Sequence, residues 1–116
     1  MSSAVEGVWR TETYVVGGTA TPVDGVLFFT DGRWATLYFV PGDQGPWGSA
    51  EAGRYRYDGG RLVFLHQLVF QGGGGRPVHI EQQASREENC EVAIEHDRLS
   101  IRFPSGNHLH LRRTGG

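Results

Sequence analysis

The chain has 116 residues, a formal net charge of −2, eleven arginines and no lysine. Its length fits one domain, the dispersed arginines lack the clustering of a nucleic-acid-binding face, and the missing lysine excludes Schiff-base chemistry. The single cysteine, Cys90, excludes an internal disulfide and the paired-cysteine zinc motifs. No apolar run is long enough to span a membrane, and the first residues, MSSAVEGVW, show no basic region followed by an apolar run, so we expect a cytoplasmic protein without membrane contact.

Residues 7–16, GVWRTETYVV, predict a first strand, followed by a loop that begins at Gly17-Gly18. The clearest hairpin covers residues 26–40, where Asp31-Gly32 separates two runs rich in Val, Leu, Phe, Tyr and Trp. A D-G pair in that position favours a type I′ turn, because glycine tolerates the positive φ that the turn needs. Both faces of the hairpin are apolar, so we expect the protein interior to cover one face and a partner subunit to cover the other.

A long irregular connection is predicted at residues 41–50, PGDQGPWGSA, because the segment contains two prolines and three glycines. Trp47 is the large apolar group within it. Connecting loops are usually polar, so this tryptophan is interpreted either as a lid over a cavity or as a residue held against the outer wall.

A second hairpin is predicted at residues 53–70, with a turn at residues 58–60. Its first arm alternates, which places Tyr55 and Tyr57 inward and the intervening arginines in water. Its second arm, RLVFLHQLVF, is again apolar on both faces. The remaining chain predicts a turn at 72–75, a strand from 77 to about 85, a polar kink at 86–89, and extended segments at 90–96, 98–103 and 108–113.

No segment shows the sustained i, i+3, i+4 apolar pattern of an amphipathic helix, so the chain is predicted to be all-β. Eight or nine strands joined mainly by tight turns indicate an up-and-down meander. Closure into an antiparallel barrel of about eight strands would remove the exposed edges of that meander. Such a barrel encloses room for packed side chains or for one small ligand. A β-sandwich is the alternative architecture.

Several short motifs resemble those of the lipocalin-like members of the calycin superfamily, a group that includes small bacterial β-barrels. Gly7-Val8-Trp9 is similar to the lipocalin G-x-W signature, and Leu111-Arg112-Arg113 is similar to the segment that carries the closing arginine of the family. The resemblance implies one lipocalin-like domain over residues 1–116, with Arg112 or Arg113 packed on the ring of Trp9. The T-D-Y motif of larger lipocalins is missing. Further similar segments are FTDGR at 29–33, GRYRY at 53–57 and DRL at 97–99.

His66 is the polar exception on one face of the second hairpin, between Phe64 and Leu68. In an apolar cavity it would be a titratable group suited to proton transfer or to holding a ligand oxygen. The alternative is a core histidine bonded to a neighbour. Tyr55, or else Tyr57, is the expected partner of His66 in proton transfer. Glu81 would join His66 as an acid/base pair if its face of the next strand pointed inward rather than to solvent.

Aromatic residues on the predicted strands are candidates for ligand contact, although ordinary core packing accounts for the same residues. His108 and His110 have the spacing of metal ligands, but the intervening leucines have the stronger claim to the interior, so no metal site and no cofactor are predicted. Cys90 has no cationic neighbour in the sequence to activate it as a nucleophile. The residues expected to contact a ligand are Trp34, Tyr38, Trp47, Tyr57, Phe64 and Phe28.

The resemblance implies binding of a hydrophobic small molecule in the central cavity, beneath the loop that holds Trp47, because barrels of this family act as carriers and occasionally as enzymes. The competing hypothesis is a cofactor-free cyclase, isomerase or dehydratase that uses the same cavity on a polyketide- or terpenoid-like substrate in natural-product biosynthesis. A third is a structural dimer with a filled core. A homodimer is expected because the outer face of the hairpins, formed by Leu27, Phe29, Leu37 and Phe39 or by their alternates, would otherwise be an exposed apolar patch.

Overall fold

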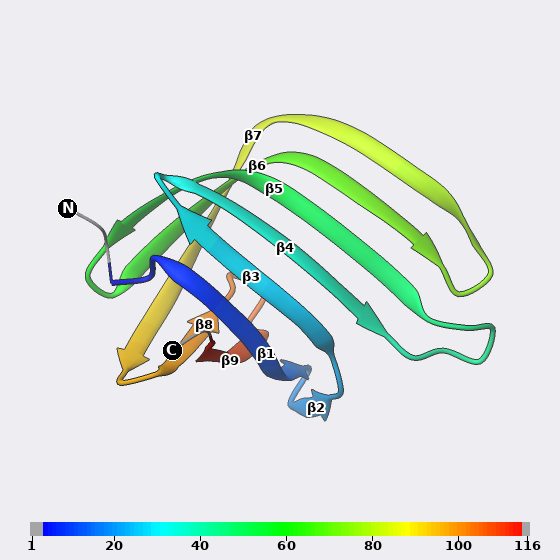
Figure 1. Ribbon diagram of the computed structural model, residues 1–116, viewed down its shortest axis with the longest axis horizontal. Helices are drawn as coiled ribbons and strands as arrows, with labels where there is room; N and C mark the ends of the chain where they lie inside the picture. Colours follow the sequence, from blue (N-terminus) through cyan, green and yellow to red (C-terminus); the bar gives the residue numbers. More distant parts are fainter. Residues whose placement is uncertain (1–3, 115–116) are drawn as a thin grey trace.

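The computed structural model describes residues 4–114, and within them the chain forms nine strands and no helix. Neighbouring strands pair in the order β2-β1-β3-β4-β5-β6-β7-β8-β9, and β1 also pairs with β9, so that eight strands close into an antiparallel barrel (Figure 1). The predicted barrel is confirmed and the sandwich is excluded. The strands are β1 (Gly7–Val16), β2 (Thr19–Thr21), β3 (Asp24–Thr30), β4 (Arg33–Val40), β5 (Trp47–Asp58), β6 (Arg61–Gly73), β7 (Arg76–Glu95), β8 (Arg98–Arg102) and β9 (His108–Arg113).

The hairpin between β3 and β4 turns at the predicted D-G pair. Thr30 pairs with Arg33 across the turn, and φ is positive at both turn residues, 50° at Asp31 and 74° at Gly32. A two-residue loop with this geometry matches the twist of the flanking strands, which is why the pair fixes the register of the whole hairpin.

Closure of the barrel decides which apolar face of this hairpin lies inside. Leu27 and Phe29 are buried in the core, whereas Phe28, Leu37 and Phe39 are 40%, 59% and 46% exposed on the outer surface. The sequence left open whether Leu27 and Phe29 or the residues that alternate with them form the outer face of β3. The outer face is formed by the alternating residues, which include Phe28. On β4 the expected pair, Leu37 and Phe39, does point outward.

One end of the barrel is sealed by a tryptophan and an arginine. The guanidinium carbon of Arg113 lies 4.2 Å from the centre of the Trp9 ring, and its two terminal nitrogens donate to the carbonyls of Glu6 (2.7 Å) and Ala4 (2.8 Å). The indole nitrogen of Trp9 donates to the carbonyl of Val5 at 2.7 Å, and Trp9 is fully buried. The cation thus stacks on the ring and also satisfies backbone carbonyls of the incoming chain.

The structure also shows which of the two adjacent arginines packs on Trp9, a choice that the sequence left open. Arg112 points away from the ring and pairs on the surface with Glu12 (3.1 Å) and Asp97 (3.5 Å). Gly7 has φ of 129°, and a Cβ there would lie 2.7 Å from the Arg113 guanidinium. The glycine of the G-x-W segment is therefore required both by its backbone conformation and by the close approach of Arg113.

β5, β6 and β7 extend beyond the other strands at the end of the barrel where β5 and β7 begin and β6 ends (Figure 1). β7 is one strand of 20 residues, of which β8 pairs only with residues 91–95. Two sequence-based expectations are corrected here. The connection predicted at 41–50 is shorter, because β5 begins at Trp47, and the kink predicted at 86–89 lies within β7, whose irregularity is at Ser85 (φ 52°). No helix within residues 4–114 is long and apolar enough to cross a membrane.

Candidate functional site

A cavity of about 220 Å³ lies inside the barrel above the packed core. This volume is smaller than the roughly 300–1,000 Å³ of sites for drug-sized ligands, so any guest is small. Buried core residues form its floor, and its walls are mainly aromatic and aliphatic. The apolar lining residues are Val23, Leu27, Trp34, Phe64, Ile101, Phe103 and Leu109.

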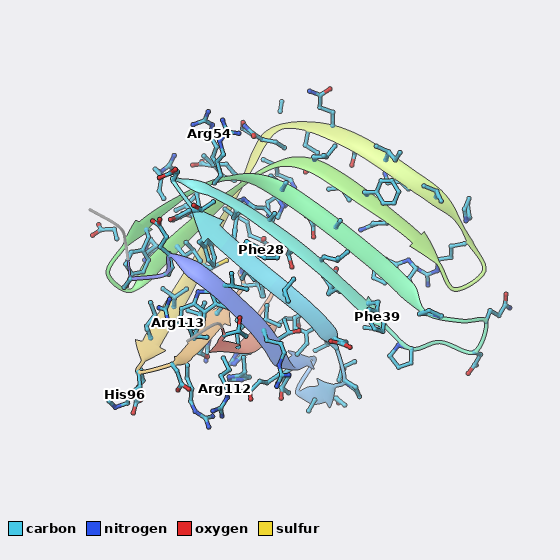
Figure 2. All side chains as sticks on the ribbon, in the orientation of Figure 1. Phe28, Phe39, Arg54, His96, Arg112 and Arg113 are labelled. Atoms are coloured by element: carbon cyan, nitrogen blue, oxygen red, sulfur yellow. The ribbon has the colours of Figure 1, made fainter. Side chains whose placement is uncertain are left out.

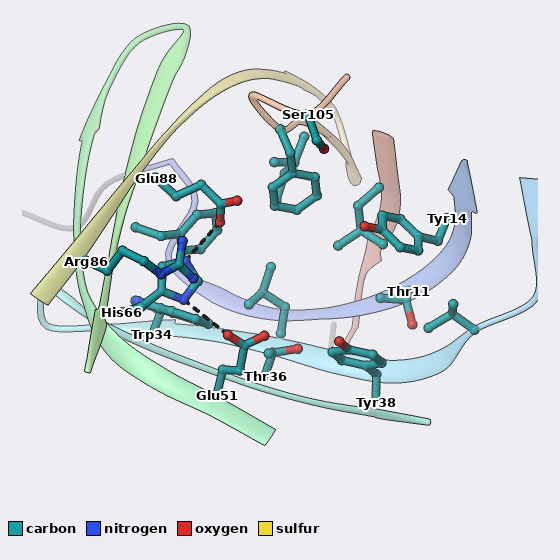
Figure 3. A pocket seen from close by; sticks show the side chains of 16 residues that line it. Thr11, Tyr14, Trp34, Thr36, Tyr38, Glu51, His66, Arg86, Glu88 and Ser105 are labelled. Carbon is teal, nitrogen blue, oxygen red and sulfur yellow. Dashed lines mark hydrogen bonds and ion pairs between the residues drawn. The ribbon is translucent and has the colours of Figure 1, made fainter. Parts of the chain in front are cut away.

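Charged groups gather on one side of the cavity, where three neighbouring strands each contribute a side chain (Figure 3). His66 on β6 is held between two glutamates: its Nδ1 lies 3.2 Å from Oε1 of Glu51 on β5, and its Nε2 lies 2.9 Å from Oε1 of Glu88 on β7. The imidazole side chain is only 6% exposed, and the two carboxylates are 20% and 25% exposed. We call this group the Glu51–His66–Glu88 cluster.

Two irregularities in the sheet allow the cluster to form. The pairing of β5 with β6 shifts register between Ala52 and Gly53, and that of β6 with β7 shifts between His66 and Leu68. At Gly53 an added Cβ would lie only 1.8 Å from the carbonyl oxygen of Leu65. A side chain is therefore excluded at the point where β5 approaches β6 most closely, and bulges of this kind re-aim neighbouring side chains.

The environment of His66 raises its pKa above the ordinary value. Burial by itself would lower the pKa, and the nearby charge of Arg86 acts in the same direction, but the hydrogen bonds with Glu51 and Glu88 outweigh both. Because an ionised carboxylate only accepts hydrogen bonds, a ring that bonds two of them donates from both nitrogens. Both ring nitrogens of His66 are thus engaged, and the raised pKa favours the imidazolium form of the ring. The second oxygens of the glutamates are the acceptors left for a ligand.

Hydroxyl groups occupy the opposite side of the cavity (Figure 3). The Thr11 hydroxyl on this side donates to the backbone carbonyl of Gly25 (3.0 Å). Thr36 instead lies beside Glu51, its partner across β4 and β5, and its hydroxyl donates to the carbonyl of Val26 (2.9 Å) (Figure 3). Burial raises the pKa of Tyr38, although a hydrogen bond with Ser49 acts in the opposite direction. The phenol of Tyr38 therefore stays protonated near neutral pH.

Four of the residues predicted to form the site meet at this cavity. Trp34, Tyr38, Phe64 and His66 all line it, and the ring centres of Trp34 and His66 are 5.1 Å apart. Alternation along β4 and β6 brings these side chains to one face, which is why the sequence indicated them together.

The other predicted residues lie elsewhere. Phe28 is on the outer face, because closure selects its neighbours for the interior, so it is not in position to contact a guest in this cavity. Tyr55 belongs to the core below, with its ring 4.9 Å from that of Phe29, and Tyr57 packs against the same core. Trp47 is not among the lining residues of the cavity. The centre of its ring lies 6.2 Å from the centre of the Tyr38 ring and 5.8 Å from the guanidinium carbon of Arg76.

Glu81, the predicted acidic partner of His66, is solvent-exposed on β7 and lies 3.8 Å from His79 rather than in the cavity. Its place in the cluster is taken by Glu51 and Glu88, which the sequence analysis did not single out. Glu51 shares the inward parity of Tyr55 and would have been found if β5 had been predicted to begin before Gly53. Glu88 was predicted to lie in a kink rather than in a strand. It is two residues from the buried Cys90 on β7, so it shares the inward face of that strand and lines the cavity.

Two other reactive groups are accounted for. Burial, together with the charge of Glu88, raises the pKa of the Cys90 thiol to about 12, so the thiol stays protonated and unreactive. His110 bonds the hydroxyl of Ser100 at 3.4 Å, and its ring centre is 6.3 Å from that of His108. Within residues 4–114 no three histidine, cysteine, aspartate or glutamate side chains gather in a metal-binding arrangement.

Comparison of the chain with models of protein families, with curated proteins and with solved structures gave no match. The fold itself is a closed antiparallel barrel of eight strands with one extra strand, consistent with a calycin-like fold. The cavity and its charged side are therefore the features of this chain that indicate function.

Proposed function

We propose that this protein is a lipocalin-like barrel that binds one small, largely apolar molecule in its cavity, with the polar end of the molecule at the Glu51–His66–Glu88 cluster. The observation that carries the proposal is the combination of apolar walls with a single charged side in a cavity of about 220 Å³. A cavity of this composition favours an amphipathic guest, since apolar surface supplies affinity and the few polar groups fix orientation.

The charged side also restricts the chemistry of the guest. Glu51 and Glu88 offer carboxylate oxygens that accept hydrogen bonds, while Arg86 lines the same side and offers donors. A hydroxyl or enol satisfies both, because it donates to a glutamate and accepts from the arginine. The predicted guest is therefore a small apolar molecule with such a group at one end. Cys90 is a free thiol, which fits the proposed cytoplasmic location.

Binding of a small fluorescent dye with one hydroxyl group, 2-naphthol, tests the binding proposal. Thr36→Trp fills the cavity from β4 and is expected to weaken dye binding at least tenfold, whereas Thr30→Trp, on an exposed position of β3, is the matched control and should bind dye like the unmodified protein. Equal dye binding by both variants, or no dye binding by the unmodified protein, would contradict a binding cavity.

A second candidate function is favoured by the buried cluster itself, because strongly coupled acid and base groups in a cavity are typical of catalytic sites. In this version the protein is a cofactor-free isomerase, cyclase or dehydratase, acting on a polyketide- or terpenoid-like substrate. A glutamate of the cluster takes a proton from carbon next to a carbonyl, the Tyr38 hydroxyl or Arg86 stabilises the enolate oxygen, and the proton returns at another position. His66 then acts as a positioning residue, since both of its nitrogens are already engaged.

Exchange of the acidic protons of 2-tetralone in D₂O, followed by proton NMR, distinguishes the enzyme from the carrier. The enzyme should accelerate exchange over buffer, and Glu88→Gln should remove about a hundredfold or more of that acceleration, the usual contribution of a general base. Glu81→Gln is the control, because Glu81 lies outside the cavity. Dye binding without any acceleration of exchange would leave the carrier as the function and exclude proton abstraction from this probe.

A further inference from the structure

A strip of large apolar side chains runs across the outer face of the barrel, on the strands whose inner faces line the cavity. Its members are each between 40% and 65% exposed. We call it the outer strip, and its residues are Phe28, Leu37, Phe39, Leu68, Phe70, Val78 and Ile80.

The register of the sheet makes the strip continuous. Leu37 on β4 pairs with Ala50 on β5, Ala50 pairs with Phe70 on β6, and Phe70 pairs with Ile80 on β7. The rows on either side have a large apolar residue on one side of β5 only: Ala52 pairs with Ala35 on β4 and Leu68 on β6, and Gly48 pairs with Phe39 on β4 and Gly72 on β6. β5 therefore forms a shallow floor of alanine and glycine between two apolar ridges, a shape into which a ridge of another molecule fits.

The strip is large enough to form an interface. Its three phenylalanines are 40–48% exposed, so at roughly 150–250 Å² per aromatic side chain they offer on the order of 250 Å² of apolar surface, to which the four aliphatic members add. A stable interface buries about 800 Å² on each partner, and contiguous apolar patches of this size are uncommon on monomers. A ring of polar residues around the strip would supply the remaining area.

The two ends of the strip carry opposite charges. Arg33 and Arg54 are exposed at one end, where they pair across β4 and β5, and Asp24 is exposed at the other end beside Phe39. Figure 2 shows Phe28 and Phe39 on the outer side of β3 and β4, with Arg54 near one end of these strands. Two copies packed face to face with their strands antiparallel would bring Arg33 and Arg54 of each copy near Asp24 of the other.

We propose that the outer strip is the interface of a two-fold symmetric homodimer. A second copy matches the strip in area, in the alternation of ridge and floor, and in the arrangement of charge, as an isologous interface requires. The interface lies outside the barrel and leaves the cavity unobstructed, so this inference is independent of the proposed ligand binding. The net charge of −2 does not favour attraction to an anionic membrane.

Sedimentation equilibrium and light scattering of the unmodified protein, from 1 to 100 μM, give the first test. The expected result is a species of twice the chain mass of 12.8 kDa. A monomer throughout this range, or association only with neutral phosphatidylcholine vesicles in a flotation assay, would overturn the proposal.

A matched pair of variants locates the interface. Leu37→Glu puts a carboxylate in the middle of the strip in both copies and is expected to raise the dimer dissociation constant by about a hundredfold or more. Val16→Glu is the control, because Val16 is 42% exposed on β1 and lies outside the strip. Near-ultraviolet circular dichroism confirms that both variants are folded. Equal dissociation constants for the two variants would place the interface elsewhere and overturn the proposal.

Charge exchange tests the antiparallel arrangement. Asp24→Arg and Arg54→Glu should each weaken the dimer by roughly threefold to tenfold, and the double variant should recover to within about threefold of the unmodified protein. If the double variant is as weak as the two single effects combined, these charges do not face each other and the proposed packing is wrong.

Discussion

The two ends of the barrel interior are built on different principles. At the sealed end, Trp9 is fully buried, and the Arg113 guanidinium stacks on it while donating to two carbonyls. At the cavity end, His66 is also buried, but it lies between two carboxylates beside unfilled space. At the sealed end, the Arg113 guanidinium completes the packing and makes its hydrogen bonds within the protein. At the cavity end, the carboxylates of Glu51 and Glu88 have oxygens that can still accept hydrogen bonds from a ligand.

This difference indicates where function and where stability reside. The sealed end is continuous with the core, in which the ring centres of Tyr55 and Phe64 lie 4.9 Å and 6.0 Å from that of Phe29. The cavity end coincides with the register shifts of β5, β6 and β7. Substitutions at the sealed end should therefore act mainly on stability, and those at the cavity end mainly on binding and on pH dependence.

The largest expected effect is at the sealed end. Trp9→Ala removes a fully buried ring and leaves Arg113 without its stacking partner, so the free energy of unfolding should fall by about 3–5 kcal/mol. Urea denaturation followed by far-ultraviolet circular dichroism measures the change. A loss below about 1 kcal/mol would show that this end does not dominate stability.

The adjacent arginines provide the next comparison. Arg113→Met should cost about 2 kcal/mol, because it removes charge-assisted hydrogen bonds to two carbonyls together with the ring contact. Arg112→Met removes only surface ion pairs and should cost less than about 1 kcal/mol. Urea denaturation of the two variants side by side checks the prediction, and the reverse order would mean that Arg112 is the closing residue.

The cavity end is tested by pH. The pKa of His66 is raised in the folded protein, so its stabilising contribution is complete below the unfolded-state value of about 6.5 and is lost as pH rises through the higher folded-state value. His66→Gln should therefore be less stable than the unmodified protein by about 1 kcal/mol more at pH 6 than at pH 9, the difference between charged and neutral hydrogen bonds. Thermal unfolding at both pH values measures this. An equal difference at both would mean that His66 is uncharged in the fold.

The smallest effect is expected for the glutamate that lies outside the cavity. Glu81→Gln should change the free energy of unfolding by less than about 0.5 kcal/mol and leave dye binding unchanged, since Glu81 is exposed and its contact with His79 is long at 3.8 Å. Glu88→Gln should alter dye affinity in the same fluorescence titration, because Glu88 lines the cavity. Equal effects of the two substitutions would contradict the assignment of Glu88 to the site.

Much of the fold could be predicted because its signals are local. The turn at Asp31-Gly32 needs only a residue pair that accepts positive φ, and the alternation along β4 and β6 needs only the period of a strand. These signals placed Trp34, Phe64 and His66 on faces that do meet at the cavity. The glutamates of the cluster escaped prediction because their segments are rich in glycine or in charge, which is typical of loops, although both belong to strands.

The sequence by itself determined an all-β chain and its main hairpins, because turn chemistry and strand periodicity act over a few residues. The tryptophan that seals one end was indicated only by the resemblance of residues 7–9 to the lipocalin G-x-W signature. Only the tertiary structure decided that Phe29 rather than Phe28 faces inward, since both faces of that hairpin are apolar and closure with distant strands selects between them. The meeting of Glu51, His66 and Glu88 was likewise decided by register shifts between strands. Register depends on pairing across the sheet and is not encoded in any one segment.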